Sequence, residues 1–429
     1  METLFYERLK EYFKDDYSTV LEKLKSESKK SFFINSIKAN SDDILEMIDF
    51  DYQKTVNPKV YYYDDEVSIG KTKVYELGLI YPQELSASLP ALIADTSEVH
   101  LAIDLASAPG GKTINILNRL SEDTLLIANE IDYKRAQVLV SNLERSGFSN
   151  VIITNKKTSD FHHLNGSVDL VILDAPCSGE GMVKKYPEII KEYSLANINQ
   201  CAKRQSEILE DAYHLLKKGG QLVYSTCTFA YEEDEKQVQD FLKKHRDMKL
   251  KKFKIADKEY DGMAKFTFLD DMEGQFMAYM IKEEEDEAIQ VKYKKTVSNK
   301  LVEDFIKDNL NLDNYYLYEQ NGHYYLSLQA LIDLKDHVLR YAIYLGDITK
   351  NRFEPSHHLY RALALKDSYK NIYYLSDEEY DTYVKGLELD ADIKNGYYAL
   401  FYKGMQFAYG KASNGKIKNK YPKGLRKTY

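Results

Sequence analysis

The sequence has no tryptophan, only three cysteines and no long uninterrupted apolar run. Every hydrophobic stretch meets a charged residue or a tyrosine before it reaches the roughly 18–20 residues that a membrane-spanning helix needs. The first eight residues lack the basic and apolar parts of a secretory signal. Three cysteines, an odd number spread over a long intracellular chain, exclude a disulfide framework, so any cysteine that matters acts as a thiol. We therefore expect a cytoplasmic protein without a membrane partner.

The chain also lacks an excess of positive charge. Its 59 Lys and Arg stand against 68 Asp and Glu, which gives a formal net charge of −9. On its face this balance argues against a nucleic-acid partner, because phosphate binding needs local positive potential. The charge is segregated, however: residues 410–429 carry seven Lys or Arg and no acid, which leaves −16 for the rest of the chain. Net charge is therefore a poor guide to the partner.

From residue 100 onward, short apolar runs alternate with amphipathic stretches. The runs have the length of buried parallel strands, and the stretches between them have helical periodicity. This alternation predicts an α/β fold with a doubly wound, Rossmann-like parallel sheet, whose ligands lie at the carboxyl ends of the strands. The predicted strands are residues 101–105, 124–128, 151–154, 169–173 and 221–225, and the predicted helices are 113–120, 133–145 and 201–216, the last capped by residues 217–220.

A chain of 429 residues is too long for one domain. We expect an N-terminal α+β region at residues 1–95 and the parallel-sheet domain at residues 96–283. An acidic run, Glu283 to Glu287, indicates a solvated linker at residues 284–300. Residues 301–429 are expected to form a further α+β unit that ends in the basic stretch.

The first chemical motif, Asp104 to Thr113, directly follows the first predicted strand and begins a helix. Its small residues let a ligand approach the backbone, and the free N–H groups of a helix start favour polar or anionic groups. Two interpretations stay open. A phosphate-binding P-loop needs Gly where Ala106 stands, but the segment otherwise satisfies that pattern. Alternatively, the pair Gly110-Gly111 makes room for the methionine part of S-adenosylmethionine.

Acidic residues follow the next two predicted strands. The second strand ends in Asn129-Glu130, where a carboxylate can accept hydrogen bonds from ribose hydroxyls. A P-loop enzyme has no special need of that acid, although Glu130 taken alone is more typical of a helix N-cap. Asp160, after the third strand, could bond an adenine amino group or cap a turn.

Two cysteines lie at the ends of adjacent strands. Cys177 belongs to the motif at residues 174–181, after the fourth strand, and Cys227 belongs to the motif at residues 225–229, after the fifth. Apolar burial does not explain two thiols flanked by Pro, Ser, Thr and Gly, whereas it does explain Cys201 on a helix. Both Cys177 and Cys227 should therefore lie at the edge of the sheet where ligands bind.

A metal is not expected at these thiols. The sequence has no Cys-x-x-Cys pair and no nearby His to complete a zinc site. The adjacent pair His357-His358 is interpreted as a polar helix start, and residues 232–235 as an acidic helix start.

Two such thiols suit methyl transfer to carbon 5 of cytosine. That carbon is not nucleophilic enough to take a methyl group directly, so a thiolate must first add at carbon 6. A second group must then assist removal of the carbon 5 proton and release of the thiol. Asp174 could hydrogen-bond the exocyclic amine or the protonated ring nitrogen and so select cytosine over uracil. The base must be unstacked, which favours RNA loops over duplex.

Taken together, these segments resemble the Fmu/Sun family of RNA cytosine-5 methyltransferases, and the likeness runs nearly from end to end. Two departures are visible: Ala106-Ser107-Ala108 stands where the family usually has Cys-Ala-Ala, and residues 33–36 lack the family's usual Arg. The resemblance is carried by residues 107–113, Asn129-Glu130, residues 174–181, Lys203-Arg204-Gln205 and residues 225–228, by residues 75–84 before the donor loop, and by residues 350–358 and 410–426, which resemble a PUA-like RNA-binding tail.

The resemblance implies a role for each motif. Cys227 would be the nucleophile, and Cys177 would assist release of the product. S-adenosyl-L-methionine would be the cofactor. Its binding set would be Ala106, Ser107, Ala108, Pro109, Gly110, Gly111, Lys112, Glu130, Asp160 and Asp174.

The same resemblance implies the class I methyltransferase sheet, an N-terminal RNA-recognition region and a PUA-like C-terminal end. The expected partner is RNA, namely the 16S ribosomal RNA of the small subunit or the 30S subunit itself, with tRNA or 23S ribosomal RNA as alternatives within the family. We expect a monomer without metal. A P-loop-like NTPase acting on RNA and a catalytically idle RNA-binding assembly factor stay open as other classes of protein.

Overall fold

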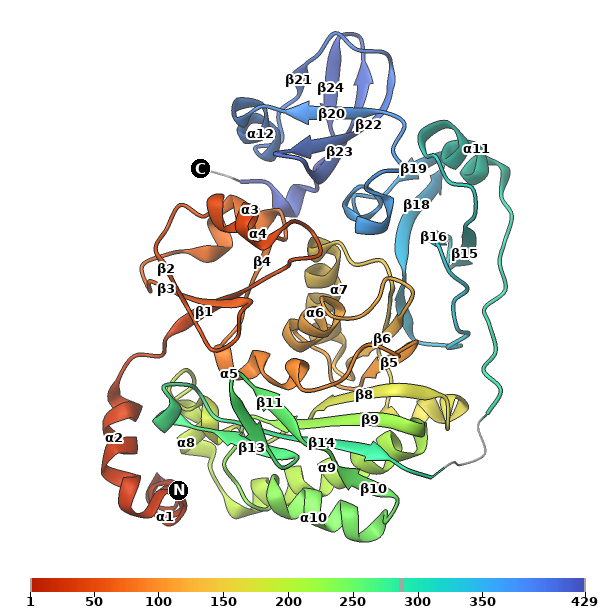
Figure 1. The fold of residues 1–429 in the computed structure, drawn as a ribbon. Helices are drawn as coiled ribbons and strands as arrows, with labels where there is room; N and C mark the ends of the chain where they lie inside the picture. Colours follow the sequence, from red (N-terminus) through yellow and green to blue (C-terminus); the bar gives the residue numbers. More distant parts are fainter. Residues whose placement is uncertain (1, 285–288, 428–429) are drawn as a thin grey trace.

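The computed structural model describes residues 2–284 and 289–427 and centres on a mixed sheet of nine strands (Figure 1). The strand order is β10-β14-β9-β8-β5-β6-β7-β17, with β13 paired to β14. Five neighbouring strands run parallel, as the sequence predicts: β9 (Leu216–Thr226), β8 (Val168–Asp174), β5 (Leu101–Asp104), β6 (Leu125–Asn129) and β7 (Val151–Thr154). Antiparallel strands extend both edges: β14 (Gln275–Lys282), β10 (Met248–Leu250) and β13 (Met263–Phe266) beyond β9, and β17 (Val338–Tyr341) beyond β7.

Helices cover both faces of this sheet. α6 (Gly111–Leu117) and α7 (Tyr133–Ser146) share one apolar core with Ala102, while α9 (Leu195–Leu215) and α10 (Glu235–Lys244) share the other core with Ile103. Successive strand residues point to opposite faces, and both faces are buried, so the strands appear in the sequence as continuous apolar runs. The predicted doubly wound α/β fold is confirmed.

The ends of α9 differ from the prediction. The helix begins at Leu195, because the side chain of Ser194 accepts the backbone N–H of Asn197 as an N-cap. It ends at Leu215, and Leu216 is already extended and paired with Val168 of β8. Residues 217–220 are therefore the first part of β9 and not a glycine-type helix cap.

The N-terminal region combines two helices, α1 (Glu2–Phe13) and α2 (Tyr17–Lys25), with a small antiparallel sheet in the order β2-β3-β1-β4. Short helices cover this sheet and lead to the first motif. Its elements are β1 (Lys30–Ile34), β2 (Tyr52–Lys54), β3 (Val60–Tyr63), β4 (Ile80–Pro82), α3 (Ser41–Glu46), α4 (Lys73–Glu76) and α5 (Leu85–Ser88), with the 3-10 helix η2 (Ile69–Lys71) before α4.

The C-terminal region follows α11 (Lys300–Asn309) and holds two further sheets. The first contains β15 (Tyr316–Gln320), β16 (His323–Ser327), β18 (Ile343–Thr349) and β19 (Arg352–Pro355). The second contains β20 (Ile372–Leu375), β22 (Gly396–Tyr402), β23 (Met405–Ser413), β24 (Lys416–Asn419) and β21 (Leu389–Asp390), beside α12 (Asp377–Val384). The 3-10 helices η7 (His358–Arg361) and η9 (Lys423–Leu425) complete the region, so most of the basic stretch is folded into β23, β24 and η9.

Three smaller elements, α8 (Glu188–Glu192), β11 (Phe253–Ile255) and β12 (Lys258–Tyr260), lie within the span of the central sheet. Residues 285–287 of the predicted acidic linker lie outside the described residues. Among the helices that the structure describes, none combines the length and the apolar character needed to cross a bilayer.

Candidate active site

A cleft of about 1070 Å³ opens at the carboxyl ends of β5, β6, β8 and β9. This is the edge where ligands of doubly wound sheets bind. Its lining includes Ala106 and Ala108 of the first motif, Glu130 after β6, and Asp174, Cys177 and Cys227 after β8 and β9. The tertiary structure therefore brings six of the twelve predicted site residues into the lining of one cleft, which does not include Ser107, Pro109, Gly110, Gly111, Lys112 and Asp160.

The two thiols are in direct contact. The Sγ atoms of Cys177 and Cys227 lie 3.3 Å apart, and both cysteines are half-buried and free. Neighbouring polar groups tie their loops together: the hydroxyls of Ser178 and Thr228 are 2.8 Å apart, and the backbone N–H of Gly181 donates to the carbonyl of Cys227 over 3.0 Å. The pair is thus held at one place by contacts on both sides.

The surroundings distinguish the two thiols. The hydrogen bond with Cys227, burial and the nearby charge of Glu233 raise the pKa of Cys177 well above its ordinary value. Burial alone would lower the pKa of Lys112, but Asp174 and, more weakly, Cys227 raise it, so Lys112 stays charged. Cys177 therefore keeps its proton at neutral pH, while Cys227 lies in the field of an ammonium group.

Asp174 is held in position by two donors. Lys112 Nζ lies 2.9 Å from its Oδ2, and the hydroxyl of Ser225 donates to its Oδ1 over 2.8 Å. Lys112 comes from α6 and Ser225 from β9, so Asp174, at the end of β8, links the first motif to the strand that precedes Cys227.

Asp104, at the end of β5, accepts hydrogen bonds from two later residues of the first motif. Its buried Oδ2 accepts the hydroxyl of Thr113 over 2.7 Å, and its carbonyl accepts the hydroxyl of Ser107 over 2.9 Å. Burial raises the pKa of Asp104 to about 6. Gly110 has φ of +114°, which a residue with a side chain rarely adopts, so the turn requires glycine there. Sequence reasoning included Asp104 in the motif but assigned it no role.

Glu130 and Asp160 have different surroundings. Glu130 is 2% exposed, accepts the backbone N–H of Asp132 with one oxygen over 2.9 Å, and pairs with Arg135 through the other at 3.2 Å. Asp160 is exposed and accepts the backbone N–H of Lys157 over 3.3 Å, as a turn cap. The cleft lining includes Lys157 to Ser159 but not Asp160, so the structure does not bring that side chain to the other predicted residues.

Two residues that the sequence analysis names without a role at the site support Cys177. Glu233 is fully buried; its Oε2 accepts the backbone N–H of Ser178 over 3.0 Å and the amide of Gln205 over 2.8 Å. The same amide of Gln205 donates to the carbonyl of Pro176 over 3.0 Å. Glu233 and Gln205 therefore hold the residues on either side of Cys177.

The acidic stretch at residues 232–235 leads into a helix, as the sequence predicts, but two of its acids are buried. α10 begins only at Glu235, and both Glu233 and Asp234 are buried. Lys265 Nζ lies 2.8 Å from Asp234 Oδ2, and Thr226 donates to Oδ1. The sequence does contain one signal for their role at the site: this run of acids directly follows the motif that contains Cys227.

Within residues 2–284 and 289–427, no group of three or more His, Cys, Asp or Glu could hold a metal ion. His357 and His358 are at the start of the 3-10 helix η7, and burial lowers the pKa of His358 to about 3. A helix does start here, as predicted. Its start is not a polar surface position, however, because His358 is buried.

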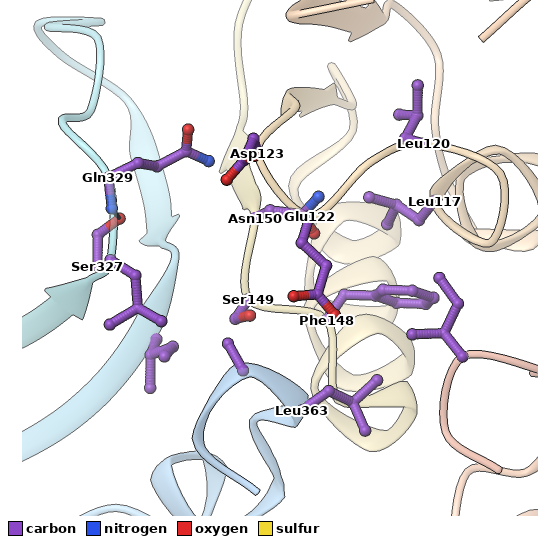
Figure 2. A pocket seen from close by; sticks show the side chains of 14 residues that line it. Leu117, Leu120, Glu122, Asp123, Phe148, Ser149, Asn150, Ser327, Gln329 and Leu363 are labelled. Carbon is purple, nitrogen blue, oxygen red and sulfur yellow. Dashed lines mark hydrogen bonds between the residues drawn. The ribbon is translucent and has the colours of Figure 1, made fainter. Parts of the chain in front are cut away.

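A second hollow, of about 120 Å³, lies between the loop after α6 and the segments that follow β16 and η7 (Figure 2). Leu117, Leu120 and Phe148 line it on one side, and Gln329 and Leu363 on the other. Its lining includes neither a cysteine nor a residue of the predicted donor set. The cleft with the thiols is therefore the better candidate for chemistry.

Comparison with known proteins identifies the family. Residues 91–281 match the family described as 16S rRNA methyltransferase RsmB/F, residues 303–365 match the RsmF rRNA methyltransferase first C-terminal domain, and residues 370–427 match the methyltransferase RsmF PUA domain. The chain belongs to the RsmB/F methyltransferases. The resemblance to the Fmu/Sun family is thereby confirmed, and the RsmB/F match favours the methyl-donor interpretation of the first motif over a P-loop.

Curated relatives of this RsmB/F chain carry the name ribosomal RNA small subunit methyltransferase F. The protein of Aliivibrio fischeri is 40% identical over 174 residues, which cover 40% of this chain and 37% of the relative. The protein of Enterobacter sp. is 37% identical over 218 residues, which cover 48% of this chain and 45% of the relative. The matched part thus spans less than half the length of these relatives.

Two solved structures share the fold. A methyltransferase homolog protein from Pyrococcus horikoshii is 27% identical, with a TM-score of 0.56, over 63% of this chain and 93% of that one. NSun6 from the same organism, solved with SFG, is 21% identical, with a TM-score of 0.57, over 66% of this chain and 98% of that one. The second likeness concerns the fold alone.

Proposed function

We propose that this RsmB/F chain transfers a methyl group from S-adenosylmethionine to carbon 5 of a cytidine in RNA, through a covalent bond between Cys227 and the base. The observation that carries the proposal is the pair of thiols 3.3 Å apart, in one cleft with the donor loop and the Lys112–Asp174 ion pair. A single-thiol or phosphate-binding mechanism does not require that second sulfur.

The donor side of the cleft fits S-adenosylmethionine, which supplies an electrophilic methyl group when bound. Gly111 lets the loop pack closely against Gln83, since a Cβ there would lie 3.1 Å from its amide nitrogen. Ala106 and Ala108 keep the lining small, and Glu130 offers a buried carboxylate that suits ribose hydroxyls. We propose residues 106–112, Glu130 and Asp174 of the predicted set as the donor site; the role of Asp160 stays a prediction.

Cys227 is the proposed nucleophile. Its sulfur forms a bond to carbon 6 of the base, which makes carbon 5 electron-rich enough to take the methyl group. Asp174 can hydrogen-bond the exocyclic amine of cytosine, which uracil lacks. A base then takes the proton from carbon 5, the electron pair of that C–H bond restores the double bond between carbons 5 and 6, and the sulfur of Cys227 leaves as a thiolate. Cys177, which keeps its proton at neutral pH, lies 3.3 Å from that sulfur and can assist by donating to the thiolate as it leaves.

The proposed substrate is the 16S ribosomal RNA of the small subunit. It is supported by the printed names of the curated relatives and by the family matches over residues 303–365 and 370–427. The basic strands β23 and β24 supply positive charge for phosphates. A tRNA or 23S ribosomal RNA substrate is the alternative. Mapping 5-methylcytidines by bisulfite sequencing of RNA from a deletion strain would decide between them.

An adduct-trapping experiment tests the roles of the thiols. Cys177→Ala should accumulate a covalent protein–RNA adduct, because the bond from Cys227 forms but is not released. Cys227→Ala should give neither adduct nor methylated product. The readout is a denaturing gel with labelled RNA, alongside incorporation of labelled methyl groups.

Cys201→Ala is the matched control, because Cys201 is buried on α9 and does not line the cleft. It should methylate RNA without accumulating an adduct. Accumulation of the adduct in the Cys227 variant would reverse the assignment. Calorimetric binding of ATP with magnesium, without binding of S-adenosylhomocysteine, would overturn the methyl-transfer proposal altogether.

A further inference from the structure

A separate cavity of about 480 Å³ lies where the three regions of the chain meet. Its walls are α4 from the N-terminal region, the last turns of α7, the helix η7 and the C-terminal segment around η9, which lie beside one another in Figure 1. We name it the junction cavity. It is lined by Gly70, Lys71, Tyr75, Glu76, Ser141, Glu144, Arg145, His357, Arg361, Tyr421, Gly424, Leu425, Arg426 and Lys427.

Cations outnumber carboxylates at the junction cavity, whose lining holds five Lys or Arg against two Glu. Arg361 is 2% exposed, and the nearby Lys38, whose Nζ reaches the carbonyl of Arg145, is 3% exposed. Burial lowers the pKa of Arg145, Arg361 and Lys38. Within residues 2–284 and 289–427, no carboxylate forms an ion pair with any of the three. Nη2 of Arg361 donates to the carbonyls of Glu76 and Arg145 over 2.7 and 2.9 Å, but carbonyl groups do not cancel a full charge, so the cluster favours an anion.

The two acidic residues of the lining are already committed elsewhere. Glu76 accepts hydrogen bonds from the hydroxyls of Tyr380 and Tyr421 over 2.9 and 2.6 Å and pairs with Lys427 at 2.8 Å. Glu144 pairs with Arg340, with 2.7 Å between the charged atoms. Both carboxylates also interact electrostatically with Arg361, but each is shared with the cation it already pairs with, so positive charge remains in excess.

Several buried nitrogen atoms around the cavity have no hydrogen-bond partner among the described residues. They are Nε of Arg145, Nε of Arg361 and both ring nitrogens of His357. Arg145 also stacks its guanidinium over the ring of Tyr75, 3.9 Å from the ring centre, which fixes its plane. Guanidinium groups and an imidazole with free nitrogens are the groups that bind phosphate oxygens.

We propose that the junction cavity is a second binding site, for a phosphate group, in which Arg145 and Arg361 neutralise the phosphate and His357 contacts it. A volume of about 480 Å³ is enough for a nucleotide unit. The phosphate has two sources, the backbone of an RNA or a free nucleotide.

This site is distinct from the cleft with the thiols. Arg135, at the start of α7, lines that cleft, and Arg145, near the end of the same helix, lines the junction cavity. Ten residues of helix separate them, which corresponds to about 15 Å along the axis. A phosphate at the junction would contact residues of the N-terminal region, the sheet domain and the C-terminal region.

Inorganic phosphate is the probe for the first experiment. The full chain is titrated with phosphate at constant ionic strength, with chloride as the balancing anion, and the thermal midpoint is recorded. Wild type should be stabilised by phosphate beyond chloride. Arg145→Gln should weaken the apparent phosphate affinity by about ten- to a hundredfold. Arg246→Gln, the same change at an exposed arginine that lines neither site, should leave it unaltered.

Ser141→Asp tests the same idea if Arg145→Gln does not fold. Ser141 is exposed in the cavity wall one helical turn before Arg145, where an aspartate would meet the guanidinium. This variant should be more stable than wild type without phosphate and should no longer respond to phosphate, whereas Ser141→Asn should behave like wild type. The proposal is overturned if wild type shows no phosphate response, or if Arg145→Gln lowers stability with unchanged phosphate affinity.

A second arm separates the two phosphate sources and rests on the proposed RNA substrate. Anisotropy of a labelled single-stranded RNA is measured over a salt series. If RNA is the source, Arg145→Gln binds it more weakly and the salt slope falls by about one. If the source is a free nucleotide, RNA binding is unchanged and a mononucleotide reproduces the phosphate response. Methyl transfer by wild type is assayed separately, so failure of the proposed function does not decide this one.

Discussion

Glu233 shows how one buried side chain can serve a site at some cost to stability. It accepts the backbone N–H next to Cys177 and the amide of Gln205, yet none of the described cations forms an ion pair with it. Burial raises the pKa of Glu233 from 4.5 to about 7. The ionised form is therefore less stable in the folded chain than in the unfolded chain. This cost is complete above about pH 7 and disappears below about pH 4.5.

Glu233→Gln removes this charge and nearly keeps the shape. At about pH 8 we expect the free energy of unfolding to rise by about 1–3 kcal/mol, and near pH 4.5 we expect no difference from wild type. Urea unfolding at the two pH values measures it. Glu207→Gln, on an exposed part of α9, should change stability little at either pH. A variant less stable than wild type at the higher pH would contradict the pKa argument.

The three cysteines show that residue type alone does not assign a role. Burial raises the pKa of Cys201 to about 11, which suits an inert apolar side chain on α9. Cys177 also has a raised pKa, but there the first cause is the hydrogen bond with Cys227, a residue 50 positions away in the sequence. The pKa is raised in both cysteines, but from different causes, and only Cys177 is in contact with a second thiol.

At the scale of elements, the loop that carries Cys177 rests on a contact between two backbones. The 3-10 helix η5 (Glu180–Met182) meets the turn before β14, and Gly274 N–H donates to the carbonyl of Gly181 over 3.1 Å. A Cβ on Gly274 would lie 2.5 Å from Gly181 Cα and 2.6 Å from the ring of Phe229. The close approach therefore requires glycine on both sides.

Gly274→Ala should accordingly displace η5. We expect the free energy of unfolding to fall by about 1–3 kcal/mol, as for other overpacked sites, and methyl transfer to slow because the Cys177 loop moves. Chemical unfolding and a methyl-incorporation assay measure the two effects. Gly70→Ala is the control, since a Cβ there meets no atom within 4 Å. Unchanged stability of Gly274→Ala would show that the turn can relax.

At the scale of the whole molecule, the regions share their cores. Phe32 and Ile80 of the N-terminal sheet pack in one cluster with Tyr380, Phe407 and Tyr421 from the C-terminal region. β17, from the C-terminal region, covers the edge of the central sheet by pairing with β7. The division into residues 1–95, 96–283 and 301–429 stays a proposal. The shared cluster joins the first unit to the last, and the β17–β7 pairing joins the second to the last.

Truncation tests this dependence. A chain ending at residue 284 would expose the edge of β7 and the apolar face of the N-terminal sheet. We expect it to aggregate, or to bind an apolar dye and unfold at a lower temperature than the full chain. Adding residues 289–429 as a separate polypeptide should restore solubility in part. A monomeric fragment with the thermal midpoint of the full chain would contradict this prediction.

The sequence by itself determined the central sheet and the places of the motifs. Burial on both faces imposes continuous apolar runs, and the turn after β5 imposes glycine at position 110, so both are local requirements that a single chain displays. The alternation of strands and helices then placed Asp174, Cys177 and Cys227 at one edge. These features were predictable because they depend on residues close together in the sequence.

Only the tertiary structure decided how those residues act. The contact between the thiols, the burial of Glu233 behind Cys177, the pairing of β17 with β7 and the unpaired arginines of the junction cavity all join segments far apart in the chain. Acids at residues 232–235 look like a solvated helix start in the sequence, because periodicity does not indicate which distant surface will cover them. The pKa of a buried group follows from that covering, so it is set by the fold and not by the residue.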